Sequence, residues 1–327
     1  MKKFIPTIIS VIVILTLATL SIVLGGYTFN ETQLEIFYIL LIICGSSALY
    51  CFVVGEISGN NSQMDKLWSL LPIAYTWVIA IKGGMDIRLI IYAILVTLWG
   101  IRLTFNFARK GAYRIKFWEG EEDYRWAILR KNSILKNRFL WALFDLFFIS
   151  IYQNLIVLAI CLPALACVGS TATFGLFDYI ASISAALFLL IELIADEEQW
   201  KFQQTKKALL SEGKSLEELD EPYSRGFNTI GLWGYLRHPN YLGEQGFWFA
   251  LYFFVLGAGA TMYGVFNMTL VGPLFLILLF LGSSTFGESI SSSKYPKYSD
   301  YQRKVFKYLP LRKYKDEDDR EDTEEKA

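Results

Sequence analysis

The sequence is poor in the residues on which metal sites and disulfide frameworks depend. It contains one histidine and four cysteines in 327 residues, and none of the cysteines has Cys-x-x-Cys spacing. Zinc sites and small disulfide-stabilised domains need denser and more regularly spaced ligands. We therefore expect no metal and no disulfide. The four cysteines lie in or beside apolar runs, where thiols pack as small hydrophobic groups: Cys44, Cys51, Cys161 and Cys167.

Charge is also scarce. Only 19% of the residues are charged and 54% are hydrophobic, whereas about a quarter of an average soluble domain is charged. No Gly-x-Gly-x-x-Gly follows a strand-like run, so a Rossmann dinucleotide domain is not expected. The formal net charge is zero. We expect a membrane protein with no nucleic-acid partner.

Eight apolar stretches are long enough to cross a bilayer. They lie near residues 5–25, 34–55, 67–81, 87–107, 140–163, 174–195, 241–260 and 264–286. The first stretch resembles a signal peptide, but its length and the lack of a small-x-small cleavage site favour a retained helix. The sequence thus predicts an all-α, polytopic membrane helical bundle of about eight transmembrane helices with cytosolic loops.

Basic residues are distributed unevenly between the two sides of this bundle. The proposed outer connections contain only two, Lys82 and Arg88, whereas the inner connections 107–138 and 197–239 contain nine and six. The positive-inside rule then places both termini in the cytosol. An endoplasmic reticulum membrane and a bacterial inner membrane both satisfy this orientation. The outer connections are 26–33, 82–88, 168–173 and 257–264.

The chain divides into two N-terminal transmembrane helices (1–55), a main membrane domain (56–312) and a charged tail (313–327). The tail lacks apolar periodicity and is expected to be disordered. A helix over 196–212 is expected to continue the sixth span into the cytosol.

The stretch Gly234–Glu244 concentrates polar side chains at the mouth of the seventh span. Proline fits the first turn of a helix, so a helix is expected to begin near Pro239. Its free N–H groups and positive dipole end would attract an anion, with Arg237 beside them. We expect the neighbouring His238 to be a capping residue rather than a catalyst.

Eight ionisable residues lie in or beside the spans, and alternating the helix directions places all of them in the cytosolic half. Charges within a bilayer usually line a cavity or pair with one another. We therefore expect a polar cavity open to the cytosol rather than unrelated snorkelling side chains. The residues are Glu56, Asp65, Arg102, Asp145, Glu192, Asp196, Glu244 and Glu288.

Four sequence blocks resemble the steroid 5-alpha-reductase and sterol-reductase superfamily, and most closely its domain-of-unknown-function 1295 branch. The resemblance covers roughly residues 56–312. Ordered blocks are more specific than a single motif, since Arg-His-Pro alone also occurs in membrane methyltransferases. The blocks are Asn60–Pro72, Trp99–Asn106, Glu122–Trp126 and Gly234–Glu244.

The resemblance implies an NADPH-dependent reductase. The hydride would go to a double bond conjugated to a carbonyl, on a steroid-like, isoprenoid or fatty lipid that enters from the bilayer. In the steroid reductases a glutamate and a tyrosine polarise the carbonyl oxygen. Glu56 matches the glutamate, with Asp65 as the alternative acid. The tyrosine has no clear equivalent here, which leaves the substrate open.

The resemblance also implies an NADPH site between the later helices and their cytosolic loops. Basic side chains would hold phosphates through charge-assisted hydrogen bonds: Arg109, Arg125, Lys206 and Arg225. Amide, hydroxyl and carboxylate groups would hold the ribose and carboxamide: Asn106, Asn240, Tyr241 and Glu244. The remaining candidates share helix faces or motifs with these residues: Arg102, Asp123, Asp196, Gln203, Arg237 and His238.

Two other functions fit parts of the pattern. The first is an S-adenosylmethionine-dependent lipid or isoprenylcysteine-type methyltransferase. Such an enzyme usually carries a paired acidic motif in its closing helix, where this chain has the single Glu288. The second is a non-catalytic lipid-binding or scaffold protein. The sequence leaves the oligomeric state open.

Overall fold

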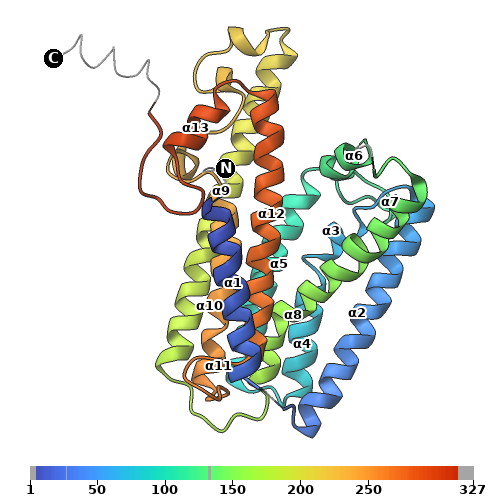
Figure 1. The fold of residues 1–327 in the computed structure, drawn as a ribbon, viewed down its shortest axis with the longest axis vertical. Coiled ribbons are helices and arrows are strands. Elements are labelled where there is room, and N and C mark those ends of the chain that lie inside the picture. The colour runs from blue at the N-terminus through green and yellow to red at the C-terminus, as the bar shows by residue number, and fades with distance from the viewer. Residues whose placement is uncertain (1–4, 27, 132–133, 316–327) are drawn as a thin grey trace, which may run out of the picture. The chain divides into compact units, whose positions relative to one another are not determined.

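The regular elements are helices throughout the part of the chain that the computed structural model describes, residues 5–26, 28–131 and 134–315. Residues 316–327 of the predicted tail lie outside this part. The α-helices (Figure 1) are α1 (Ile5–Leu24), α2 (Glu31–Ser58), α3 (Gln63–Leu67), α4 (Leu71–Lys82), α5 (Ile87–Ala108), α6 (Tyr124–Arg130), α7 (Arg138–Phe144), α8 (Gln153–Ala166), α9 (Leu176–Ser211), α10 (Pro239–Leu251), α11 (Phe253–Gly257), α12 (Val271–Lys294) and α13 (Tyr298–Lys304).

Shorter helical elements connect some of these helices. A π-helix, η2 (Asp145–Tyr152), joins α7 to α8 without a break. The 3₁₀ turns are η3 (Leu216–Glu218), η4 (Tyr223–Arg225), η5 (Gly231–Gly234) and η6 (Met268–Leu270).

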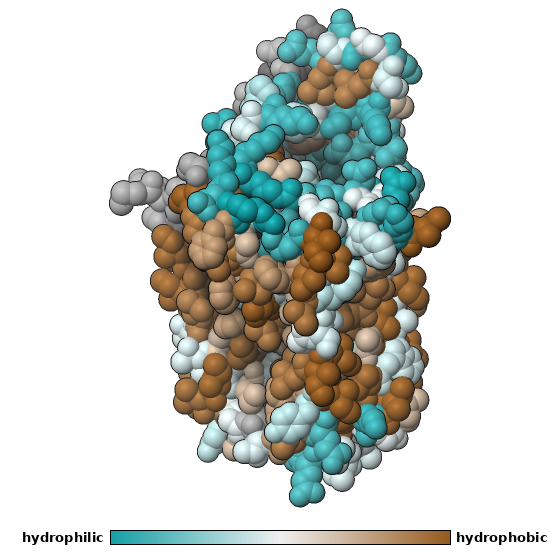
Figure 2. Space-filling model, turned by 90° about the vertical axis from the view of Figure 1, so that its right-hand side faces the viewer, coloured by the Kyte–Doolittle hydropathy of each residue, from teal (hydrophilic) through white to brown (hydrophobic). Residues whose placement is uncertain are grey.

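Six helical stretches of the described residues are long and apolar enough to cross a membrane. Their large hydrophobic side chains face outward: Val23, Ile42 and Leu176 are each about 70% exposed. Figure 2 shows one face on which such residues cover a broad area. Exposed apolar surface of this extent is typical of a membrane protein. The stretches are Thr7–Leu24, Glu31–Ser58, Ile87–Ala108, Arg138–Ala166, Leu176–Ser211 and Met268–Lys294.

The third and seventh predicted spans take shorter forms. α4 has 12 residues, or about 18 Å at 1.5 Å per residue, less than the ~30 Å hydrocarbon core of a bilayer. The seventh is divided at Tyr252 into α10 and α11. The Tyr252 hydroxyl donates to the carbonyl of Val265, 2.7 Å away. The predicted count of eight therefore remains a prediction beside the six long spans.

The described chain forms two compact units. Unit 1 comprises residues up to 186 together with 248–278, and unit 2 comprises 187–247 and 279 onward. Helices α9, α10 and α12 contribute residues to both units.

In unit 1, α4 packs against α5 and α8, and α2 packs against η2 and α8 (Figure 1). Tyr75, Tyr92 and Trp99 are fully buried there. The Trp99 ring meets that of Trp248 edge-on, with 5.0 Å between centroids. All four cysteines are buried free thiols, as the sequence predicts.

The predicted outer connections meet at one end of unit 1. Arg88 pairs with Asp178 at 2.6 Å and donates to the carbonyls of Ala172 and Gly257. Gln33 donates to the carbonyl of Val168, 3.0 Å away. Arg88 is only 2% exposed. Arg88 is thus a basic residue in connections that otherwise contain few, and the structure gives the reason: Asp178 neutralises its charge inside the protein.

Candidate functional site

In unit 2, the segment 223–246 runs antiparallel along one face of α9. The ring of Tyr223 stacks on Phe202, 5.3 Å between centroids, and Lys206 donates to the carbonyl of Gly226 at 2.6 Å. Closer to the N-terminal end of α9, Glu198 accepts the N–H of Leu232 at 2.9 Å. Because the segment runs opposite to α9, these contacts bring the first turn of α10 beside the middle of α9.

Two glycines permit this close approach. Gly231 has a positive φ of 59°, and a Cβ added there would collide with the Glu198 carboxylate. A Cβ at Gly243 would collide with Glu192 and with the backbone of Phe188. Glycine tolerates both a positive φ and a neighbour too close for a Cβ. The α9–α10 contact therefore depends on backbone packing, which places Glu192 and Glu244 in buried positions.

As predicted, α10 begins at Pro239. Arg237, just before it, is held in place by neighbouring groups: its Nε donates to Glu288 Oε1 at 2.8 Å, and its Nη1 donates to the carbonyls of Gln302 and Val305 at 2.6 and 2.9 Å. A guanidinium with these partners is already neutralised. In this structure Arg237 fixes the segment after α13 rather than standing ready for an external phosphate.

Glu288 is the centre of the same cluster. Besides Arg237, it bonds His238 Nε2 at 2.9 Å and accepts the amide of Gln302 at 3.0 Å. Lys307 lies 3.7 Å from it. Three charged or polar donors on a buried carboxylate form a strong, specific junction. This junction ties the C-terminal segment to α12.

His238 lies inside this cluster rather than at an open site. Its ring stacks on Tyr241 at a centroid distance of 5.1 Å, and Tyr241 meets Phe280 edge-on. Burial lowers the pKa of His238, and the Glu288 carboxylate opposes this effect without cancelling it. The neutral imidazole is therefore favoured near pH 7, which fits a positioning role.

Lys206 differs from the other predicted phosphate ligands of unit 2. It is 8% exposed, and its ammonium lies 5.5 Å from the ring centroids of Phe202 and Tyr295. Within the described residues no carboxylate pairs with it. A buried ammonium usually has an anionic partner. Lys206 is therefore a cation that an anionic ligand would complement.

Asn240 carries a second unsatisfied group. Its amide nitrogen lies 3.5 Å from Asp196 Oδ1, and its Oδ1 is buried with no hydrogen-bond partner among the described residues. The Oε1 of Gln199, three residues after Asp196, has none there either. Buried amide oxygens without donors are uncommon. An amide-bearing ligand would satisfy them.

The ammonium of Lys206 and the amide oxygen of Asn240 lie at two separated points along α9. Asp196 and Lys206 are ten residues apart on α9, a separation of about 15 Å along the helix. An extended dinucleotide spans a distance of this order. Asn240 would receive the carboxamide and Lys206 a phosphate. A ligand with an amide at one end and a negative charge about 15 Å away would complement both groups.

Arg225 and Gln203 complete the predicted residues of unit 2. Arg225 pairs with Glu221 at 2.6 Å and donates to Thr229 at 3.0 Å, so its charge is compensated locally. Gln203 is half-buried on α9. Gln199 was not predicted from the sequence. Its spacing of three residues from Asp196 and four from Gln203 places it on the same face of α9 as those two residues.

In unit 1, the Asn60–Pro72 block fixes the loop that precedes α6. The Lys66 ammonium donates to the carbonyls of Phe117 and Glu119 at 2.8 and 2.7 Å. Gln63 donates to the carbonyl of Trp118 at 3.0 Å, and Asn60 to that of Gly120 at 3.0 Å. Side chains of this block therefore replace the backbone partners that a sheet or helix would supply.

Asp65 is the candidate acid that this block presents. It accepts the indole N–H of Trp126 at 2.9 Å. Burial raises the pKa of Asp65, the nearby Asp123 carboxylate raises it further, and Arg125 and Trp126 act in the opposite direction. Asp123 caps α6 and pairs with Arg125 at 2.7 Å. The structure thus brings together Asp65, Asp123 and Arg125, three of the predicted site residues.

Glu56 has different surroundings. Both of its carboxylate oxygens accept hydrogen bonds from the guanidinium of Arg138. Two predicted cofactor ligands, Asn106 and Arg109, contact each other, with 3.0 Å between Arg109 Nε and Asn106 Oδ1. Arg102 lies on the same helix, α5.

Comparison with known proteins gives the family without an activity. The family described as "Protein of unknown function (DUF1295)" matches residues 51–305. The uncharacterized protein C594.04c of Schizosaccharomyces pombe is 34% identical over 283 residues, covering 80% of this chain and 78% of the yeast protein. No solved structure matches the chain. The match over most of the sequence shows that the chain belongs to the DUF1295 family.

Proposed function

We propose that the protein is a membrane-embedded, NADPH-dependent reductase of the steroid 5-alpha-reductase type. Its substrate would be a conjugated carbon–carbon double bond in a steroid-like, isoprenoid or fatty lipid. Two buried groups carry this proposal: the Lys206 ammonium, which bonds a carbonyl but pairs with no carboxylate among the described residues, and Asn240 Oδ1, which has no donor there. The sequence blocks shared with the reductases supply the reaction class.

On this proposal, the residues of unit 2 bind and orient the cofactor. Asn240 Oδ1 and Gln199 Oε1 accept hydrogen bonds from the carboxamide N–H groups. Lys206 pairs with the 2′-phosphate. When bound, NADPH supplies the hydride. Arg237, His238 and Glu288 hold the first turn of α10 in position and touch no reactant.

Asp65 is the better of the two proposed acids. Burial raises the pKa of Asp65, so its carboxyl is protonated more readily than that of an exposed aspartate, and the protonated form can donate a hydrogen bond to a carbonyl oxygen as negative charge develops there. Both carboxylate oxygens of Glu56 are already occupied by the Arg138 guanidinium, so neither is free to contact a substrate oxygen. We therefore assign the polarising role to Asp65, held by the Trp126 indole.

The same proposal includes eight membrane crossings with both termini in the cytosol. α4 and the α10–α11 pair would supply the two crossings beyond the six long spans. The basic connections 107–138 and 197–239 would then face the cytosol, where NADPH is available.

Binding of the cofactor tests the proposal. Detergent-purified protein is titrated with NADPH, NADH and S-adenosylmethionine, and the apparent Tm is measured. A ligand at a hundred times its Kd adds about 2.7 kcal/mol of stability. We expect NADPH to raise the Tm more than NADH does, and S-adenosylmethionine to leave it unchanged. Stabilisation by S-adenosylmethionine alone would establish the methyltransferase alternative.

Two neighbouring lysines provide a matched comparison. Lys206→Met removes the buried cation, whereas Lys207→Met removes an exposed one from the same helix. A charge-assisted hydrogen bond contributes about 1.5–3 kcal/mol, or roughly tenfold or more in affinity. We expect Lys206→Met to lose the preference for NADPH over NADH, and Lys207→Met to keep it. Equal preferences in both variants would exclude Lys206 as the phosphate ligand.

A further inference from the structure

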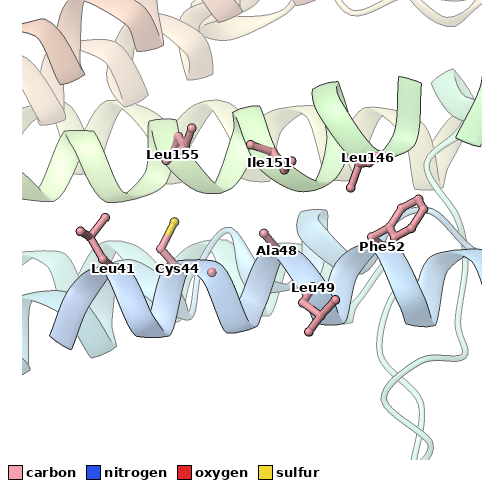
Figure 3. Close-up of a pocket in the computed structure, with 9 residues that line it drawn as sticks. Leu41, Cys44, Ala48, Leu49, Phe52, Leu146, Ile151 and Leu155 are labelled. Atoms are coloured by element: carbon pink, nitrogen blue, oxygen red, sulfur yellow. The ribbon is translucent and has the colours of Figure 1, made fainter. Parts of the chain in front are cut away.

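A lipid-facing groove runs between α2 and the helix formed by η2 and α8 in unit 1 (Figure 3). Its volume is about 390 Å³ and its lining is almost entirely hydrocarbon. On α2 the lining extends from Leu41 to Phe52, which corresponds to about 16 Å along the axis. Leu146, Ile151 and Leu155 form the opposite wall. A long, narrow apolar groove suits a linear chain.

The sequence produces this groove in two ways. Gly45 and Ala48 leave space on α2, and a Cβ added at Gly45 would meet nothing within 4 Å. On the other wall, the π-helical register aligns residues five apart, so Leu146 and Ile151 lie on one face. Ser150 is turned away, 3.3 Å from the buried Asp145 carboxylate. π-Helical turns are rare and often occur at functional sites.

Both walls belong to helices that are candidate membrane spans. Ile42, beside the groove, and Leu49, in its lining, are 69% and 64% exposed, which indicates that the groove opens to the bilayer interior. Water does not fill such a groove, and a lipid chain there competes with other lipid chains of equal polarity. Selective binding therefore needs a polar contact at one end.

That contact is available one helical turn beyond Phe52. Glu56 pairs with Arg138 there, and the Arg138 side chain remains 67% exposed. The pair uses two of the five N–H donors of the guanidinium, and no other partner binds the rest within the described residues. Arginine donors suit the oxygens of a phosphate. We propose that the groove binds one acyl chain of a bilayer phospholipid whose phosphate contacts Arg138.

The test uses phosphatidylglycerol carrying a photoreactive diazirine in one acyl chain, and diacylglycerol with the same label as the headgroup-free probe. Both are added to the full-length protein in nanodiscs, and crosslinked peptides are mapped by mass spectrometry. We expect phosphatidylglycerol to label peptides of α2 and α8 at the groove. Diacylglycerol should label them roughly tenfold less, the loss expected for one charge-assisted hydrogen bond.

Variants separate the chain from the headgroup. Gly45→Leu fills the groove, whereas Ser46→Leu adds the same side chain at the adjacent exposed position outside it. We expect Gly45→Leu to abolish groove labelling and Ser46→Leu to keep it. Arg138→Gln should reduce phosphatidylglycerol labelling to the diacylglycerol level. Equal labelling of the two leucine variants would overturn the groove site, and unchanged labelling of Arg138→Gln would overturn the phosphate contact.

Discussion

Removing Arg88 should destabilise the protein more than any other single loss of a charge in its proposed outer connections. Arg88 binds Asp178 through two nitrogen–oxygen contacts of 2.6 and 3.0 Å, and the side chains are 2% and 0% exposed. Arg88→Met leaves the Asp178 carboxylate buried without its cation. Breaking a buried pair in this way costs about 3–5 kcal/mol. The apparent Tm should fall by on the order of 10 °C.

The assay is thermal unfolding of detergent-purified protein, with Lys82→Met as the control. Lys82 is the other basic residue of the same connection and is exposed, so its loss should leave the Tm unchanged. The double variant Arg88→Met/Asp178→Leu should recover most of the lost stability, because replacing both charges by apolar groups removes the uncompensated carboxylate. A Tm of Arg88→Met equal to that of the parent would refute the reasoning.

Two further predictions concern topology and pH. In sealed cells, an impermeant maleimide should label cysteines introduced at the exposed positions Thr171 and Met262 from outside, but not at Lys116 or Ser215; the reverse pattern would invert the proposed orientation. Because the folded-state pKa of His238 lies below its usual 6.5, protonation favours the unfolded chain, so stability should fall as the pH drops below about 6.5. This loss should be smaller in His238→Gln, and identical pH profiles of Tm for the two proteins would contradict the assignment.

Helix positions were largely accessible from the sequence, because hydropathy and proline act locally. Pro239 begins α10 as predicted, and α9 continues past the apolar span to Ser211, close to the predicted end at Glu212. The π-helical register of η2 was not predicted, since a shift from four to five residues leaves an apolar segment equally apolar. The break at Tyr252 was not predicted either; its hydroxyl contacts the carbonyl of Val265, 13 residues along the chain, and no local pattern specifies that contact.

The candidate site was predictable in composition but not in the state of each side chain. The sequence placed Arg237, Arg225 and Lys206 together as cations, yet only their tertiary partners distinguish them. Arg237 is neutralised by Glu288 and Arg225 by Glu221, whereas Lys206 bonds a carbonyl. Likewise, the two acids Glu56 and Asp65 differ in their neighbours, Arg138 and Trp126, which are 82 and 61 residues away in the chain.

The length of α9 has a practical consequence for imaging. Its 36 residues extend about 54 Å at 1.5 Å per residue, well beyond the ~30 Å hydrocarbon core. The protruding end is a continuous helix followed by exposed residues from Glu212 to Ser215. A rigid helical partner fused in register there would inherit the helix direction and add mass outside the detergent belt. Such a fusion would serve as a fiducial for aligning particles of this 37.5 kDa protein in cryo-electron microscopy.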